Sequence, residues 1–202
     1  MASQTMKNAK FLYKGLVLLC LAVLLAVMSV CRAGAREPAS EESVKAAIFF
    51  NLIRFVEWPD SAVPDPSSPR IVAIFGQDAL QERMVEMVAS AGLSSRVSVL
   101  EVSELNQLEA CRDGIQVLYV ARSAHKLIPQ ILDLLQARPV LTVGDDEGFV
   151  MQAGMINFMR QNDRIRFDIN LDQAEKSRLK MSSRLFGLAR VIVRDGVARE
   201  MR

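Results

Sequence analysis

The chain has 202 residues, of which half are hydrophobic, and its 25 basic side chains nearly balance its 23 acidic ones. Four of the basic residues and none of the acidic ones lie before residue 36, so the rest of the chain holds 21 basic against 23 acidic residues. A protein that binds nucleic acid needs a basic excess. This composition therefore excludes nucleic acid as a partner.

The first 35 residues have the anatomy of a secretory signal peptide. Three lysines precede an unbroken apolar run over residues 15–30, and Ala33-Gly34-Ala35 supplies the small residues that a signal peptidase reads. The run is shorter than the roughly 20 residues that a spanning helix needs. We expect cleavage between Ala35 and Arg36 and export to the periplasm. An uncleaved membrane anchor and a lipoprotein modified at Cys31 are the alternatives.

Residues 36–202 are long enough for one domain with a sizeable core. Two of the three cysteines lie in the signal peptide, so Cys111 remains alone and an intramolecular disulfide is impossible. Cys111 stands just before an apolar segment, which favours a buried structural thiol over an intermolecular disulfide.

The first predicted element after the signal peptide is a helix that runs to about Trp58, where Pro59 ends it. Apolar residues between Val44 and Val56 recur at helical spacing on two sides, so we expect this helix to be buried on most of its surface. Ser43 or the pair Glu41-Glu42 could cap its beginning. The proline-rich residues 59–69 predict a loop.

The middle of the chain alternates short apolar strands with helices. Strands are predicted from Arg70 to Phe75 and over 97–102, 115–120 and 139–143, with helices over 78–90 and 123–137 and a connecting segment over 103–114. Fully apolar strands that alternate with helices are typical of a parallel sheet covered on both faces. The fold class is therefore α/β, with a mainly parallel sheet flanked by helices.

The pattern changes near the C-terminus. Residues 155–159 and 165–169 alternate apolar and polar side chains around a turn at 161–163, which predicts an antiparallel hairpin on the sheet edge. A short helix over 171–178 follows, and Ser182-Ser183 can cap a last helix that leads to a strand over 191–193.

Two segments resemble the motifs of a known family. Residues 45–59, KAAIFFNLIRFVEWP, resemble the opening motif of the YfiR-like family, and residues 154–192, GMINFMRQNDRIRFDINLDQAEKSRLKMSSRLFGLARVI, resemble its closing motif. Together with the strands between them, the two motifs cover nearly the whole of residues 36–202.

The resemblance implies a periplasmic α/β domain, often dimeric, without enzymatic activity or a cofactor. It implies that an inner-membrane diguanylate cyclase or sensor kinase is the partner, that an outer-membrane lipoprotein can sequester the repressor, and that cyclic-di-GMP and biofilm formation respond. The best-known member carries a disulfide in the stretch that corresponds to Gly148–Gly154. This stretch contains no Cys here, so the resemblance does not carry redox control over to this chain.

Two groups of residues are candidates for a functional site. Asp145, Asp146 and Glu147 follow a strand at the carboxyl edge of the predicted sheet, where open α/β folds bind ligands, and their oxygens could hold a ligand or a divalent cation. A solvated acidic loop is the alternative. The chain's only histidine, His125, has no cysteine or second histidine beside it, so no metal site of that kind is expected.

The second group lies on and beside the predicted hairpin. Arg164, Arg166 and Asp168 alternate with apolar residues, so they share one face of the hairpin, and Phe149 lies in the neighbouring loop. Arginine and aromatic residues are enriched at interface anchors, so these four residues are candidates for binding a partner. A merely solvated strand face is the alternative.

Three functional hypotheses follow. The first is a non-catalytic regulatory protein that binds an inner-membrane signalling protein. The second is a periplasmic module that binds a small molecule in the crevice at the strand ends. The third, an envelope hydrolase, lacks a G-x-S-x-G motif and has one histidine to serve every serine.

Overall fold

The computed structural model describes residues 40–62, 65 and 67–201. The expected signal peptide and its cleavage point between Ala35 and Arg36 lie outside these residues. In the described part, eight strands form one sheet and two short strands, β1 (Val56–Glu57) and β8 (Lys180–Met181), form another. The large sheet contains β2 (Arg70–Phe75), β3 (Val97–Val102), β4 (Val117–Val120), β5 (Leu141–Gly144), β6 (Ile156–Gln161), β7 (Arg164–Asn170), β9 (Val191–Arg194) and β10 (Val197–Glu200).

The strands of the large sheet lie in the order β10-β9-β7-β6-β5-β4-β2-β3. From β3 to β6 every neighbouring pair is parallel, whereas β6–β7 and β9–β10 are antiparallel pairs. This confirms the predicted α/β class with a mainly parallel sheet and an antiparallel hairpin near the C-terminus. The order reverses between β2 and β4, because β3 lies on one side of β2 and all later strands lie on the other.

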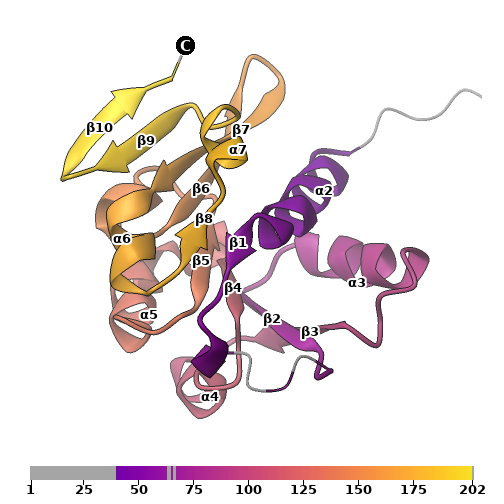
Figure 1. The fold of residues 1–202 in the computed structure, drawn as a ribbon. Helices are drawn as coiled ribbons and strands as arrows, with labels where there is room; N and C mark the ends of the chain where they lie inside the picture. Colours follow the sequence, from indigo (N-terminus) through magenta and orange to yellow (C-terminus); the bar gives the residue numbers. More distant parts are fainter. Residues whose placement is uncertain (1–39, 63–64, 66, 202) are drawn as a thin grey trace, which may run out of the picture. The chain divides into compact units, whose positions relative to one another are not determined.

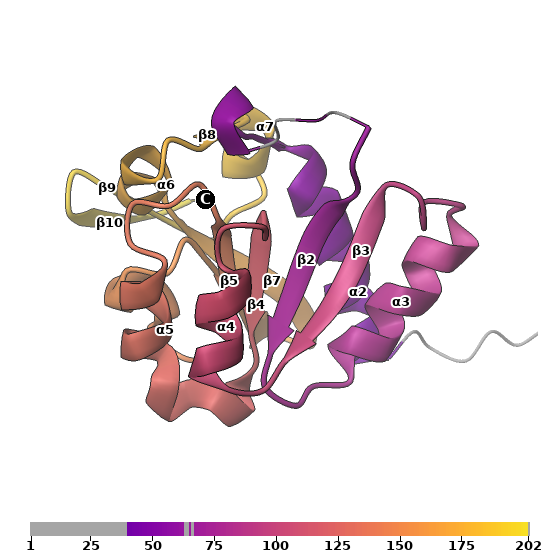
Figure 2. The same cartoon turned by 90° about the horizontal axis from the view of Figure 1, so that it is seen from below.

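Helices cover both faces of the sheet, as Figures 1 and 2 show. α2 (Glu41–Arg54) and α3 (Leu80–Ser90) pack on one face, and α4 (Leu105–Cys111), η2 (Arg122–Leu127), α5 (Ile128–Leu134) and η3 (Phe149–Gln152) pack on the other. Successive strand residues point to opposite faces. Val117 and Tyr119 of β4 therefore join the core under α2, and Leu118 and Val120 join the core under α5.

The first helix is displaced from its predicted bounds. Ser40 is the N-cap residue, because its side chain accepts a hydrogen bond from the Ser43 amide, and the helix ends at Arg54 rather than at Trp58. Val56 and Glu57 instead pair with β8. Ala46, Phe49, Leu52 and Ile53 are buried, Asn51 and Arg54 are exposed, and the other residues of this helix are half-buried, so its surface is covered on more than one side.

Two further features differ from the prediction. The segment 103–114 was predicted as a connection but contains α4, a helix of seven residues. Because Leu108 is its only buried residue, the helix has no apolar periodicity that could be detected in the sequence. The β6–β7 hairpin is not at the sheet edge, because β9 pairs with β7 and β10 follows. The strand β10 is exposed along its whole length and has no apolar alternation that would reveal it.

The chain between β7 and β9 forms two short helices, α6 (Leu171–Lys176) and α7 (Ser183–Phe186), where longer helices were predicted. Asn170 caps α6 and Ser182 caps α7 through their side-chain oxygens. Asp172 on α6 accepts hydrogen bonds from the amides of Asp195 and Gly196, so it holds the turn between β9 and β10.

Candidate functional site

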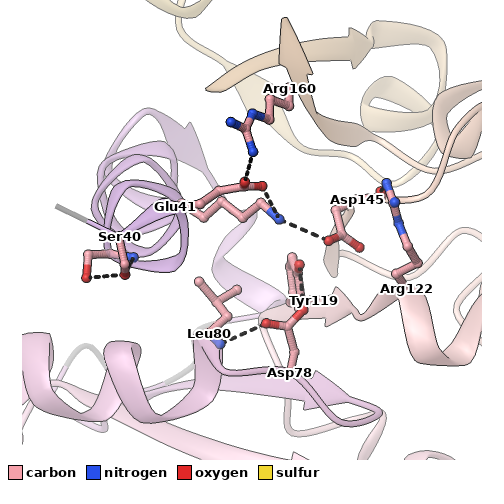
Figure 3. Close-up of polar contacts among 10 residues, drawn as sticks. Ser40, Glu41, Asp78, Leu80, Tyr119, Arg122, Asp145 and Arg160 are labelled. Carbon is pink, nitrogen blue, oxygen red and sulfur yellow. Dashed lines mark hydrogen bonds and ion pairs between the residues drawn. The ribbon is translucent and has the colours of Figure 1, made fainter. Parts of the chain in front are cut away.

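A chain of charged side chains joins α2 to the carboxyl edge of the sheet (Figure 3). The Nζ atom of Lys45 lies 3.2 Å from Oδ2 of Asp145, which follows β5, and 3.2 Å from Oε1 of Glu41, one turn earlier in the helix. Arg160 of β6 contacts the other oxygen of Glu41 at 3.2 Å. The Lys45 and Asp145 side chains are 14% and 9% exposed, so this pair is shielded from solvent.

Tyr119 lies next to this pair, at the carboxyl edge of β4. Its hydroxyl donates a hydrogen bond to Oδ2 of Asp78 at 3.2 Å, and its ring packs against Phe49 of α2. Asp78 follows β2 and also accepts the Leu80 amide at 2.8 Å, which fixes the start of α3. Because β2 and β4 flank the point where the strand order reverses, these groups occupy the place where open α/β sheets bind ligands.

Asp145 is held by its backbone as well as by its side chain. Arg122 at the start of η2 donates a hydrogen bond to the Asp145 carbonyl oxygen at 2.9 Å. The residue is 7% exposed. Its Oδ1 atom is buried and has no hydrogen-bond partner among the described residues. Lys45 therefore provides most of the favourable interaction that offsets the cost of burying the negative charge of this carboxylate.

The surroundings of Tyr119 and Lys45 raise the pKa of both side chains, so both stay protonated at neutral pH. Burial and then the negative charges of Asp145 and Asp78 raise the pKa of Tyr119 far above its ordinary value. Burial alone would lower the pKa of Lys45, but the charge of Asp145 and the hydrogen bonds to Glu41 and Asp145 outweigh it, so that pKa is raised. A neutral phenol and a charged ammonium are poor nucleophiles. The cluster is suited to holding α2 on the sheet.

Alkaline pH is expected to destabilise the protein through these two groups. A group whose folded pKa is raised contributes stability that is complete below its unfolded pKa and is lost as the pH rises toward the folded value. For Tyr119 and Lys45 the loss begins near their ordinary pKa values of 10.0 and 10.5. Denaturant unfolding followed by circular dichroism should therefore show a falling free energy of unfolding above about pH 10.

Tyrosinate absorbance provides an independent check of this expectation. Tyr13 lies in the segment that we expect to be removed, so Tyr119 is the only tyrosine of residues 36–202. Its absorbance change should coincide with the loss of the circular dichroism signal. A tyrosinate signal that develops near pH 10 while the protein stays folded would contradict the buried, hydrogen-bonded phenol.

The acidic triplet divides between core and surface. Asp145 is buried and paired, Asp146 is half-buried, and Glu147 is exposed. No group of three or more His, Cys, Asp or Glu side chains in residues 40–62, 65 and 67–201 has an arrangement that could hold a metal ion. The use of these three residues for a ligand remains a prediction. Asp145 has a structural role that the sequence pattern did not indicate.

Phe149 does not occupy an exposed loop. It begins η3, is 0% exposed, and packs in the core under α5. Gly144 and Gly154 leave room for its ring, since a Cβ atom on Gly144 would lie 2.8 Å from the Phe149 Cδ2 atom and one on Gly154 would contact the ring even more closely. The expectation that this side chain is available to a partner is wrong for the described fold.

Asp168 is also buried rather than solvated. It is 4% exposed and accepts two hydrogen bonds from the Arg190 guanidinium, at 3.0 Å from Nε and 2.7 Å from an Nη atom. Arg190 reaches it because β9 lies beside β7. The expectation that the Asp168 side chain is available to a partner is therefore wrong for the described fold, and so is the alternative of a solvated residue, whereas Arg164 and Arg166 are exposed.

The outer half of the β6–β7 hairpin forms an arm at the carboxyl edge of the sheet. β6 pairs with β5 only through Ile156 and Asn157, and β7 pairs with β9 only from Asp168 onward. Residues 158–167 therefore pair with each other, apart from the Phe167 carbonyl, which accepts a hydrogen bond from the Arg190 amide, and their turn projects in Figure 1. We call residues 158–167 the basic arm, because it carries Arg160, Arg164 and Arg166 against a single acidic residue, Asp163.

Sequence reasoning missed Lys45, Asp78, Tyr119 and Arg122. Two signals could have found three of them. Lys45 shares the apolar stripe of α2 with Phe49 and Leu52, where a charged side chain needs a buried partner. Asp78 and Tyr119 lie at the carboxyl ends of β2 and β4, at the same edge that drew attention to Asp145. The contact of Arg122 with a backbone carbonyl has no sequence signal.

The YfiR/HmsC-like family matches residues 42–190, and the chain belongs to this family. No curated protein matches the chain. The crystal structure of a conserved domain protein from Vibrio cholerae O1 biovar El Tor strain N16961 is similar in fold, with a TM-score of 0.50 and 10% sequence identity. That match covers 74% of this chain and 60% of the other, so the chain spans less than two thirds of that protein.

Membership defines the general class of the protein. The YfiR-like family comprises periplasmic, non-catalytic regulators of diguanylate cyclases. Among the residues that the structure describes, no helix is long and apolar enough to cross a membrane.

Proposed function

We propose that this chain binds the periplasmic region of an inner-membrane signalling enzyme, a diguanylate cyclase or a sensor kinase, and holds it inactive. The observation that carries the proposal is the family match across residues 42–190, which includes the opening motif and all but the last two residues of the closing motif. Within this proposal the protein is exported by cleavage after Ala35 and acts as a homodimer. An outer-membrane lipoprotein would relieve the inhibition by sequestering it, and cyclic-di-GMP and biofilm formation would then rise.

The basic arm is the surface that we propose for the signalling enzyme. Arg164 and Arg166 are exposed on β7. Beyond Ile156 and Asn157 no other strand pairs with the arm, and only its Phe167 carbonyl is bonded to a residue outside it, the Arg190 amide, so a partner can approach the outer part of both edges. Exposed arginines favour a partner surface of opposite charge and accelerate the encounter. We therefore expect the contacted region of the enzyme to be acidic.

Recovery of the partner from the envelope tests the proposal. The full chain, tagged at its C-terminus, would be exported in its native host and recovered from detergent-solubilised envelope, and the enriched proteins would be identified by mass spectrometry. Enrichment of a diguanylate cyclase or a sensor kinase is expected, together with a rise of cyclic-di-GMP on deletion of the gene. Recovery without any membrane signalling protein would contradict the proposal.

Charge reversal of the arm is expected to remove the partner without unfolding the protein. The double variant Arg164→Glu, Arg166→Glu should reduce recovery of the enzyme by about tenfold or more, which corresponds to about 1.4 kcal/mol or more of binding free energy. Its free energy of unfolding should stay within about 0.5 kcal/mol of the parent, because both side chains are exposed. Arg199→Glu, exposed on β10, is the matched control and should retain the enzyme.

A small-molecule-binding module is the second candidate. An open groove of about 520 Å³ lies beside Asp78 at the carboxyl edge, and Glu82 and Glu101 also line it. The acidic lining favours a cationic ligand. A saturable rise of the melting temperature with such a ligand, lost in Asp78→Asn, would favour this function over pure protein binding.

A further inference from the structure

A cavity of about 240 Å³ lies at the amino-terminal ends of β4 and β5, on the opposite edge of the sheet from the charged cluster. Three arginines from separate segments line it. Arg112 follows α4, Arg138 precedes β5, and Arg178 follows α6. Ser61 of η1 (Asp60–Ala62) adds a hydroxyl. This convergence of arginines is independent of the proposed function.

The acidic residues near the cavity neutralise its arginines only in part. Asp113 itself lines the cavity and forms an ion pair with Arg138, and Glu109 lies 3.7 Å from an Nη atom of Arg112. The Arg112 Nε atom is buried and has no hydrogen-bond partner in the described part of the chain. Arg178 forms no ion pair with any described carboxylate within 4.0 Å. The three arginines together therefore keep a net positive charge and N–H groups that can donate hydrogen bonds to a ligand.

Arg178 occupies a backbone position that ordinarily favours glycine. Its φ angle is 58°, in the left-handed region. Its amide donates to the Glu175 carbonyl and the following Leu179 amide donates to the Ala174 carbonyl, so Arg178 is the C′ residue of a Schellman motif. An arginine here raises the energy of the fold relative to glycine. A use for its guanidinium would account for its presence.

We propose that Arg112, Arg138 and Arg178 bind a phosphoryl oxyanion. Guanidinium groups form paired, charge-assisted hydrogen bonds with phosphate oxygens, and a tetrahedral phosphate offers acceptors to donors that converge from several directions. The cavity is smaller than the roughly 300–1,000 Å³ of pockets for drug-sized ligands. The volume of the cavity suits a phosphate group that carries at most a small substituent inside the cavity. A free phosphate and the phosphodiester of a lipid head group share this chemistry.

Calorimetry on the protein purified from the periplasm after export of the full chain tests the proposal. Inorganic phosphate would be titrated at constant ionic strength with chloride as the balancing anion, because a specific site must survive charge screening. Saturable binding is expected for the parent. Arg178→Asn should weaken it by about tenfold or more, since a charge-assisted pair is lost. Asn tolerates the left-handed region, so the melting temperature without phosphate should not fall.

Arg199→Asn is the matched control, because Arg199 is exposed on β10 outside the cavity. It should bind phosphate like the parent. Sedimentation with vesicles of phosphatidylglycerol and of phosphatidylcholine distinguishes the two sources of the phosphoryl group. Binding to phosphatidylglycerol that Arg178→Asn removes, without saturable binding of free phosphate, would assign the site to a lipid head group. Failure of both probes, or equal binding by Arg178→Asn and the parent, would overturn the proposal.

Discussion

Phe149→Ala is expected to reduce the free energy of unfolding by about 3–5 kcal/mol, the usual cost of truncating a fully buried phenylalanine. The ring is 0% exposed and contacts the core under α5. Gly144 and Gly154 on either side cannot fill the space that the ring would leave. Urea unfolding monitored by circular dichroism measures the loss. A cost below about 1 kcal/mol would contradict the buried position.

Two further variants show whether the ring itself is responsible. Met151→Ala lies in the same turn, where Met151 is 67% exposed, and should change stability by less than about 0.5 kcal/mol. Gly154→Ala introduces a methyl group against the Phe149 ring and should destabilise by about 1–3 kcal/mol through overpacking. In the double variant Phe149→Ala, Gly154→Ala the new methyl group meets no ring. The double variant should therefore lose less free energy of unfolding than the two single variants lose together. Additive costs would contradict the contact.

The same variant separates a structural role of Phe149 from a binding role. Because the side chain is buried, Phe149→Ala should weaken recovery of a partner only in proportion to the fraction of unfolded protein. Arg164→Glu, Arg166→Glu should weaken it while the protein stays folded.

Local periodicity was sufficient to predict seven strands of the large sheet, the fold class and the hairpin, because alternation and apolar runs depend on neighbours in sequence. It did not predict β1, β8 or β10. It could not show what covers each face. Asp168 alternates with apolar residues as a solvated residue would, but β9 brings Arg190 to it from 22 positions away. The left-handed Asn162 and Asp163 fit the predicted turn, while the place of the hairpin inside the sheet depends on distant pairing.

The charged cluster illustrates the same limit. The acidic triplet after β5 was recognised from its position at the sheet edge, and the structure places Asp145 there. Lys45 is 100 residues earlier in the chain, and no local pattern links the two. The opening motif contains this lysine, but the motif alone does not indicate that its charge lies over the carboxyl end of β5.

Lys45→Met is expected to reduce the free energy of unfolding by about 3–5 kcal/mol, because it leaves the buried Asp145 carboxylate without a cation. The partners are 14% and 9% exposed, and Asp145 Oδ1 already lacks a hydrogen bond among the described residues. Asp145→Asn should cost less than Lys45→Met, since Lys45 keeps Glu41 at 3.2 Å. Urea unfolding at neutral pH measures both. Lys126→Met, an exposed lysine in η2, is the control and should be nearly neutral.

The double variant Lys45→Met, Asp145→Asn decides whether the two charges act as a pair. With both charges removed, no buried ion lacks a partner, so the double variant should be more stable than Lys45→Met alone. If the double variant were less stable than Lys45→Met, the 3.2 Å contact would not be the interaction that holds α2 on the sheet. Across these variants, the amount of membrane partner recovered should fall as the free energy of unfolding falls, since the basic arm is joined to α2 through Arg160 and Glu41.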